Sequence, residues 1–240
     1  MKNDSVKRYY DILQKRKWSL FVKRFFDIVL SFFLLIVLLP VFLILSLAIK
    51  LDSPGPVLFR QERVTRYGKR FRIFKFRTMV NHAEELGTQI TLDDDRRITR
   101  VGRFMRRFHL DETIQLLDVL RGTMTFVGTR PEVSLYVSQY TDEMMATLLL
   151  PAGITSLTSI MFRDEEKLMK DTKNADLDYA HQILPCKMKY NLYSVAHFTL
   201  RFELKTMFQT IWAVFYTNYK VQDVLEQEDD FENSRREAIV

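Results

Sequence analysis

Cysteine, glycine and proline are scarce in this 240-residue chain, which holds one cysteine, seven glycines and six prolines. The single thiol, Cys186, excludes a disulfide framework and a cysteine-based zinc site within one chain. The glycine patterns of a P-loop and of a dinucleotide-binding turn are both missing, which excludes those two kinds of nucleotide site. The four histidines are scattered, and each is predicted to be an ordinary core or surface residue.

The chain carries an excess of basic residues. Its 36 Lys and Arg against 30 Asp and Glu give a formal net charge of +6. This surplus favours anionic partners, such as a membrane surface, phosphate groups or nucleic acid, without choosing among them. No recognised nucleic-acid-binding module is present, so we expect no nucleic-acid partner. The length suits one substantial domain with an anchor, and residues 226–240 are predicted to be a disordered charged tail.

One long apolar run, residues 28–49, is predicted to enter a membrane. Only Ser31, Pro40 and Ser46 interrupt its 22 residues. A straight helix of that length would measure about 33 Å, close to the thickness of the hydrocarbon core. The run starts too late and is too long for a cleaved signal peptide, and no small-residue cleavage site follows it. We therefore expect a retained membrane segment.

Two features argue against a simple transmembrane crossing. Pro40, near the middle of the run, removes one backbone hydrogen bond and is expected to bend the helix. Both flanks are basic, with eight Lys and Arg in residues 1–27 and nine in residues 50–80. The positive-inside rule places such flanks in the cytoplasm. A re-entrant helix that turns back at Pro40 satisfies both flanks and is favoured, while a spanning helix with a tolerated proline stays open.

Residues 57–77 are predicted to form a β-hairpin with its turn around Gly68. Alternation along the second strand places Lys75 and Arg77 on the same face as Ile73. The two cations can therefore hold an anion beside an apolar base. Charges on a solvated edge strand, which discourage pairing with other chains, give the same pattern.

Two further segments have the spacing of amphipathic helices. In residues 98–108 the apolar residues follow helical spacing, while arginines that include Arg106 occupy the other faces. Such a helix binds phosphates or an anionic membrane, although a solvated surface helix looks the same. An apolar stripe from Leu200 to Phe215 is predicted to be core, with an interfacial helix as the alternative.

Asp111 and Glu112 stand side by side at the start of another helix, which Gly122 is expected to end. Backbone N–H groups and the dipole at a helix N-terminus favour an ionised carboxylate. An ionised Asp111 can serve as a structural cap or as a nucleophile, so the local pattern leaves both roles open. Arg130 follows in GTMTFVGTRPE, which is predicted to be a tight glycine-rich loop. An arginine there suits bidentate phosphate binding, or is an ordinary surface residue.

Taken in order, these motifs resemble the bacterial sugar transferases of the monotopic phosphoglycosyl transferase family. The resemblance runs from Lys23 to about Phe215. It rests on KRFFD, the proline-broken apolar helix, SPGPVLFRQERV, KFRTM, DDDRRITRVGRFMRR, LDE with QLLDVL, VGTRPE and PAGIT. Any one piece is weak, but the ordered set is specific.

The resemblance implies a helix-dominated α+β fold in the bacterial inner membrane. Residues 1–22 would form a basic segment and residues 23–50 the re-entrant helix, broken at Pro40. Residues 51–225 would form a cytoplasmic catalytic domain with a β-hairpin and interfacial amphipathic helices. Homo-oligomers or glycan-assembly partners are compatible with this arrangement.

The resemblance also implies a reaction. A sugar-1-phosphate would move from a UDP-sugar to a polyprenyl phosphate, namely undecaprenyl phosphate, to initiate exopolysaccharide, capsule or other glycan synthesis. Asp111 would be the nucleophile that carries the phosphosugar, and Glu112 would bind Mg²⁺. The residues implied in substrate binding are Lys75, Arg77, Arg106, Gln115 and Arg130.

Several positions depart from the family pattern. Leu39 stands before the helix-breaking proline where Ser is frequent, and Thr113 begins the run after the acid pair where Leu-Pro-Gln is usual. The family's GDMS is GTMT here, with Thr123 in place of the acid, and its VGPRP is VGTRP, with Thr129 in place of a proline. The acid pair and Arg130 remain. The alternative is therefore a catalytically degenerate scaffold of a glycan-assembly complex, and the sequence does not identify the sugar.

Overall fold

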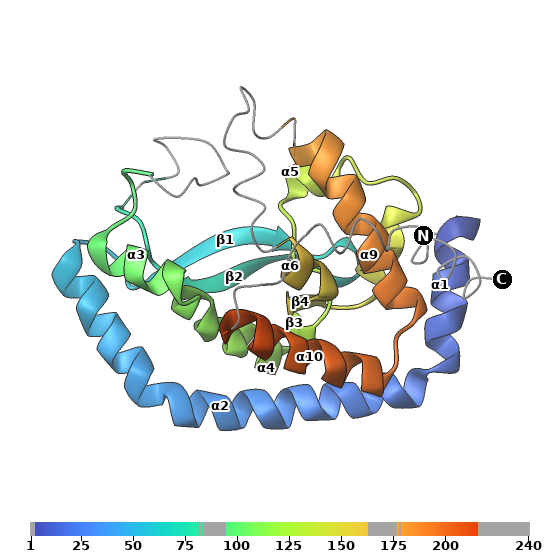
Figure 1. Ribbon diagram of the computed structural model, residues 1–240, viewed down its shortest axis with the longest axis horizontal. Helices are drawn as coiled ribbons and strands as arrows, with labels where there is room; N and C mark the ends of the chain where they lie inside the picture. Colours follow the sequence, from blue (N-terminus) through green and yellow to red (C-terminus); the bar gives the residue numbers. More distant parts are fainter. Residues whose placement is uncertain (1–2, 82, 84–94, 163–176, 178, 216–240) are drawn as a thin grey trace.

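Helices dominate the structure, and two small sheets lie among them (Figure 1). The computed structural model describes residues 3–81, 83, 95–162, 177 and 179–215, so the predicted tail lies outside the described residues. The elements up to the acid pair are α1 (Asp4–Lys15), α2 (Lys17–Asp52), β1 (Leu58–Val64), η1 (Arg66–Gly68), β2 (Arg70–Phe76), α3 (Arg100–Arg107) and η3 (Leu110–Gln115). Those that follow are α4 (Leu116–Arg121), β3 (Met124–Val127), α5 (Ser134–Val137), η4 (Met144–Leu149), β4 (Ala152–Thr155), α6 (Leu157–Met161), η5 (Tyr179–Ile183), α9 (Leu184–Ala196) and α10 (Leu200–Phe215). The predicted helix-dominated α+β class is confirmed.

The first sheet is the predicted hairpin. β1 and β2 pair in antiparallel register from Leu58 opposite Phe76 to Val64 opposite Arg70. The turn is made by η1, where Gly68 has a φ of +72°, a left-handed conformation that glycine adopts at little cost.

The second half of the hairpin strand β2 is buried on both faces. Phe74 and Phe76 pack in an apolar cluster with Phe42 of α2, while Ile73 packs against α4 and β3 on the other side. Burial therefore protects this half of the strand, whereas Arg70 and Arg72 in its first half are exposed. The packing also holds the backbone of Lys75 in a fixed place between two buried neighbours.

The second sheet pairs two short strands, β3 and β4, in parallel. β3 occupies residues 124–127, so the prediction of a glycine-rich loop is wrong for those four residues. The residue after β3, Gly128, lies against Gly153 near the start of β4. A Cβ on Gly153 would lie 2.2 Å from the backbone nitrogen of Gly128, and this contact requires glycine. The loop that carries Arg130 begins directly after this contact.

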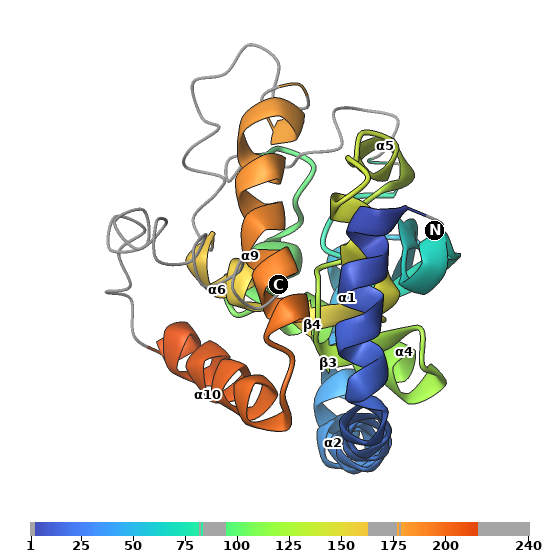
Figure 2. The same ribbon diagram turned by 90° about the vertical axis from the view of Figure 1, so that its right-hand side faces the viewer.

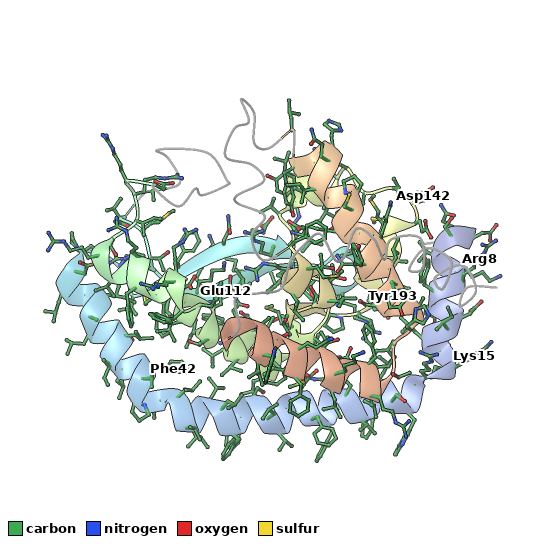
Figure 3. The ribbon with its side chains drawn as sticks, viewed as in Figure 1. Arg8, Lys15, Phe42, Glu112, Asp142 and Tyr193 are labelled. Carbon is green, nitrogen blue, oxygen red and sulfur yellow. The ribbon has the colours of Figure 1, made fainter. Side chains whose placement is uncertain are left out.

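The apolar segment forms one continuous helix, α2, of 36 residues with Pro40 inside it. Figure 1 shows that α2 lies along one side of the domain and bends, and Figure 3 places Phe42 near this bend. By length and composition the helix is able to cross a membrane, and only 17% of its most apolar window is buried within the protein. Both halves nevertheless contact the same domain, because Arg24 binds α4 and Phe42 packs on the hairpin.

Polar side chains on one face of α2 fasten it to the domain. The Lys23 ammonium donates a hydrogen bond to the carbonyl of Val127 at 2.9 Å and pairs with the carboxylate of Glu203 on α10. Asp27 accepts a hydrogen bond from the Thr125 hydroxyl at 2.7 Å. Lys23, Asp27 and Glu203 are all buried. The KRFFD motif thus joins α2 to β3 and α10.

The neighbouring Arg24 closes the end of α4. Its guanidinium donates to the carbonyls of Val119 at 2.6 Å and Leu120 at 3.0 Å, in the last turn of the helix, where carbonyls lose the partners that a longer helix would supply. The Val119 carbonyl also accepts from the backbone of Gly122 at 3.0 Å. Gly122 follows with a φ of +86°, so the predicted helix stop is confirmed.

The C-terminal helix α10 has its polar face inward and its apolar face outward. Glu203 and Thr206 are buried, and the Thr210 hydroxyl lies 2.7 Å from that of Thr155. The prediction that its apolar stripe is core is wrong, because these polar contacts fix the opposite face against the domain. Among the side chains described for α10, the large apolar ones that are exposed are Leu204, Phe208, Ile211 and Trp212. Both views place α10 at the same end of the molecule as α2 (Figures 1 and 2).

The substitution Lys23→Met is expected to destabilise the protein strongly. It leaves Glu203 buried without its cation, and loss of one partner from a buried ion pair costs about 3–5 kcal/mol. For a chain of this size the unfolding temperature should fall by at least about 6 °C, measured by thermal unfolding in detergent. Lys17→Met, at the exposed start of α2, is the matched control. Equal melting of the two variants would contradict a stabilising role for Lys23.

Candidate active site

The acid pair lies in the first turn of the short helix η3. α3 ends at Arg107, and His109 then takes a left-handed conformation with a φ of 52°, which redirects the chain into η3. His109 is the N-cap residue, and Asp111 and Glu112 lie inside the first turn. The interpretation of Asp111 as the helix cap is therefore wrong, because the reversal at His109 moves the cap position two residues earlier.

Glu112 binds two cations that come from distant parts of the chain. Lys75 Nζ of β2 donates to its Oε1 at 2.8 Å. Arg130, in the loop after β3, donates Nη1 to Oε2 at 3.0 Å and Nη2 to Oε1. Figure 3 places Glu112 within the molecule, below the hairpin in that view. The arrangement is a two-pronged Arg–carboxylate pair with a lysine added, which is a strong type of charge-assisted hydrogen bonding.

The two adjacent acids have opposite pKa shifts. Burial would raise the pKa of Glu112, but Arg130 and Lys75 hold it well below its ordinary value. Burial, and then the charge of Glu112, raise the pKa of Asp111, while Lys75 and Arg106 oppose that rise. Glu112 is therefore ionised and held in place by its two cations, whereas the raised pKa of Asp111 makes this carboxyl group harder to ionise. Pairs of acids separated in this way often divide two chemical roles.

Hydrogen bonds join Lys75 and Arg130 to Glu112, which is next to Asp111 in the chain. The charge of Arg106 on α3 lowers the pKa of Asp111.

Arg77 is placed elsewhere, and Gln115 is deeply buried. The Arg77 guanidinium donates to the carbonyls of Ser53 at 2.7 Å and Pro54 at 2.8 Å, where α2 ends. It therefore closes the turn that leads out of α2. Gln115 is only 2% exposed, at the end of η3. Substrate binding by these two residues stays a prediction.

A second polar cluster, which the sequence did not reveal, adjoins Arg130. Glu132, Tyr179 and Lys187 are buried together, and Arg63 of β1 lies beside them. Glu132 stands in the VGTRPE motif, but nothing in that motif shows that its carboxylate is buried. Tyr179 and Lys187 are about fifty residues further along the chain, and no sequence feature connects them with Glu132.

The residues of the site fit a metal ion only together with a substrate. Among the described residues, no group of three or more His, Cys, Asp or Glu side chains is placed to hold a metal. Asp111 and Glu112 supply two carboxylates. Magnesium sites commonly combine one or two carboxylates with substrate phosphates and water. These carboxylates therefore suit a Mg²⁺ ion that is also coordinated by substrate phosphates, rather than one coordinated by protein groups alone.

These features define a site for handling anionic groups. Two cations are held in place by an ionised carboxylate, beside a second carboxylate of raised pKa. Residues 18–217 match the sequence model of a family described as bacterial sugar transferase. The chain belongs to this family.

Known relatives are undecaprenyl-phosphate sugar phosphotransferases. One is the UDP-N-acetylgalactosamine-undecaprenyl-phosphate N-acetylgalactosaminephosphotransferase of Aeromonas hydrophila, 33% identical over 197 residues, which are 81% of this chain and 44% of that protein. Another is the UDP-glucose:undecaprenyl-phosphate glucose-1-phosphate transferase of Escherichia coli, 34% identical over 81% of this chain and 40% of that protein. A third is the undecaprenyl-phosphate galactose phosphotransferase of Salmonella typhimurium, 33% identical over 86% of this chain and 43% of that protein. The chain spans less than half the length of these three relatives.

Proposed function

We propose that the protein is a phosphoglycosyl transferase that moves a sugar-1-phosphate from a UDP-sugar to undecaprenyl phosphate. The observation that carries this proposal is the pair of cations, Lys75 and Arg130, that Glu112 holds beside Asp111. Membership of the bacterial sugar transferase family and the names of the relatives support the substrate classes. The product would begin the assembly of an exopolysaccharide, capsule or related glycan.

In the first step Asp111 acts as the nucleophile. A carboxylate oxygen forms a bond to the phosphorus that bears the sugar. The bond from that phosphorus to the oxygen bridging the two phosphates breaks, and UMP leaves with the electron pair. Arg130 and Lys75 stabilise the charge on the phosphoryl oxygens. The product of this step is a phosphosugar–aspartyl intermediate.

In the second step the lipid acceptor releases the sugar phosphate. A phosphate oxygen of undecaprenyl phosphate forms a bond to the same phosphorus, and the bond to Asp111 breaks. The carboxylate is thereby regenerated, and the product is an undecaprenyl-diphosphate sugar. Neither step needs a proton transfer, since each nucleophile is an anion and each leaving group departs as one.

Glu112 acts as the fixed anion that positions both cations. Its low pKa keeps it charged throughout the reaction. We further propose that Glu112 binds Mg²⁺ together with the substrate phosphates, where the ion would neutralise phosphate charge. Because Glu112 already accepts hydrogen bonds from Lys75 and Arg130, a phosphate that takes over one of these donors would free a carboxylate oxygen.

The exposed apolar surface supports location of the protein at the inner membrane. The two basic flanks of α2 support an orientation in which the site faces the cytoplasm. α2 lies along the domain instead of projecting from it, and contacts near both of its ends join the same domain (Figure 1). This course is consistent with a re-entrant helix whose two basic flanks share one side. The exposed face of α10, with Phe208 and Trp212, would lie at the lipid surface. A polyprenyl acceptor requires such a location.

The departures at Thr123 and Thr129 do not disturb the local fold. The Thr123 hydroxyl donates to the carbonyl of Asp118 at 3.1 Å, and the carbonyl of Thr129 accepts from the backbone of Gly153 at 2.9 Å. Both threonines therefore take part in ordered hydrogen bonds. We favour an active enzyme over a degenerate scaffold for this reason.

Intact-protein mass spectrometry tests the proposed function directly. The purified protein, mixed with Mg²⁺ and a panel of UDP-sugars without lipid acceptor, should gain the mass of one phosphosugar. Asp111→Asn should abolish this adduct, because the amide is not a nucleophile toward phosphorus. An adduct that persists in Asp111→Asn would remove Asp111 from its role. Absence of an adduct with every donor would favour the scaffold.

The substitution Lys75→Met is expected to move the acid limb of the pH–rate profile to higher pH. Asp111 must be ionised to attack, and its activity is lost as the pH falls through its pKa. The ammonium of Lys75 lowers that pKa, so its removal raises the pKa further. The rate of adduct formation, normalised to its plateau, measures the shift. Lys69→Met, exposed in the hairpin turn, is the control and should leave the limb in place.

Cysteine labelling tests the re-entrant course of α2. In a Cys186→Ser background, Lys17→Cys and Leu51→Cys place single thiols at the two exposed ends of the helix. Both should react with an impermeant maleimide in inverted membrane vesicles and resist it in right-side-out cells. Labelling of the two thiols from opposite sides would establish a spanning helix.

A further inference from the structure

The buried cluster beside Arg130 has no part in the reaction steps proposed above. Glu132, Tyr179 and Lys187 come from the loop after β3, from η5 and from α9. The Tyr179 hydroxyl donates to Oε1 of Glu132 at 2.6 Å, and Lys187 Nζ donates to the Tyr179 oxygen at 3.0 Å. Lys187 Nζ also lies 3.9 Å from Oε1 of Glu132. A buried carboxylate is costly unless it is paired in this way, so the cluster fixes Glu132.

The segment Arg130–Pro131–Glu132 is short and stiff. The ring of Pro131 locks its own φ and restricts the backbone of Arg130 to extended conformations. Glu132 is anchored twice, because its carbonyl accepts from the backbone of Val64 at 3.0 Å and its carboxylate accepts from Tyr179. Fixing Glu132 therefore fixes the point from which Arg130 reaches Glu112.

Arg63 connects the cluster with the acid pair. Its guanidinium donates to the carbonyl of Pro131 at 3.3 Å, which adds a third anchor to the same segment. Burial lowers the pKa of Arg63, and the charge of Glu132 is the main opposing influence, while Arg130 and Glu112 also act on it. Arg63 is thus influenced by the charge of Glu132 on one side and by the charges of Glu112 and Arg130 on the other.

We propose that Glu132, Tyr179 and Lys187 are positioning residues that hold Arg130 in place for the transferred phosphoryl group. This inference rests on the proposed function. Through these contacts η5 and α9 control the geometry of a site whose reacting groups all come from earlier in the chain. A displacement of about 1 Å at such a group can cost up to about a hundredfold in rate.

A double-mutant cycle on the full chain tests the proposal. Tyr179→Phe removes the bridging oxygen and keeps the ring, whose centroid lies 4.7 Å from that of Tyr136. Single-turnover adduct formation with Mg²⁺ and a reactive UDP-sugar is measured for the wild type, Tyr179→Phe, Arg130→Lys and the double variant. Tyr190→Phe, which removes a buried hydroxyl from α9 outside the cluster, is the control for lost stability.

Tyr179→Phe should lower the maximal rate about tenfold in the wild type and less than about twofold in the Arg130→Lys background, because contacting networks give non-additive effects. The donor concentration for half-maximal rate should change little, and Tyr190→Phe should retain the wild-type rate. An equal loss in both backgrounds, or the same loss in Tyr190→Phe, would overturn the proposal and assign Tyr179 to folding alone.

The same four proteins separate failure of this inference from failure of the proposed function. If the wild type forms no adduct with any donor, the proposed function fails, and the cycle is decided on unfolding temperatures. The shifts caused by Tyr179→Phe and Arg130→Lys should then differ from additivity by about 2 °C or more. Additive shifts would show that the cluster does not act on Arg130.

Discussion

The ionised carboxylate of Glu112 is the contact on which the rest of the site depends. It joins three segments that are far apart in sequence, namely β2 through Lys75, η3 through its own backbone, and the loop after β3 through Arg130. A buried carboxylate and two partly buried cations are each unfavourable alone, and only their assembly offsets the loss of hydration. The same assembly gives Asp111 an anionic neighbour and a cationic one, whose opposing influences on its pKa set how readily it ionises.

The long apolar helix α2 is tied by hydrogen bonds to the segments that carry the candidate site. Arg24 binds the end of α4, which continues directly from η3 and its two acids. Asp27 binds the side chain of Thr125 and the backbone of Phe126, in the strand that leads to Arg130. Both segments are therefore fixed to α2 by hydrogen bonds. In the proposed membrane location of α2, these contacts hold the site at a constant depth relative to the bilayer.

Sequence patterns predict those elements whose conformation depends on neighbouring residues in the chain. The hairpin followed from alternation around Gly68, and the end of α4 followed from Gly122. Periodicity shows that one face of a helix is apolar but not what covers it, so it assigns the exposed apolar face of α10 to the core. β3 escapes prediction because four residues between glycines give little signal. Arg77 has the chemistry of an anion ligand, but whether it binds substrate or the carbonyls of Ser53 depends on tertiary contacts.

The loop that carries Arg130 is held on both of its sides. On one side, the carbonyl of Thr129 accepts a hydrogen bond from the backbone of Gly153, in the parallel strand β4. On the other side, Pro131 locks its own φ, and the buried carboxylate of Glu132 is held by Tyr179. Arg130 is thus fixed between two anchors, and these contacts restrict the conformational entropy of the loop.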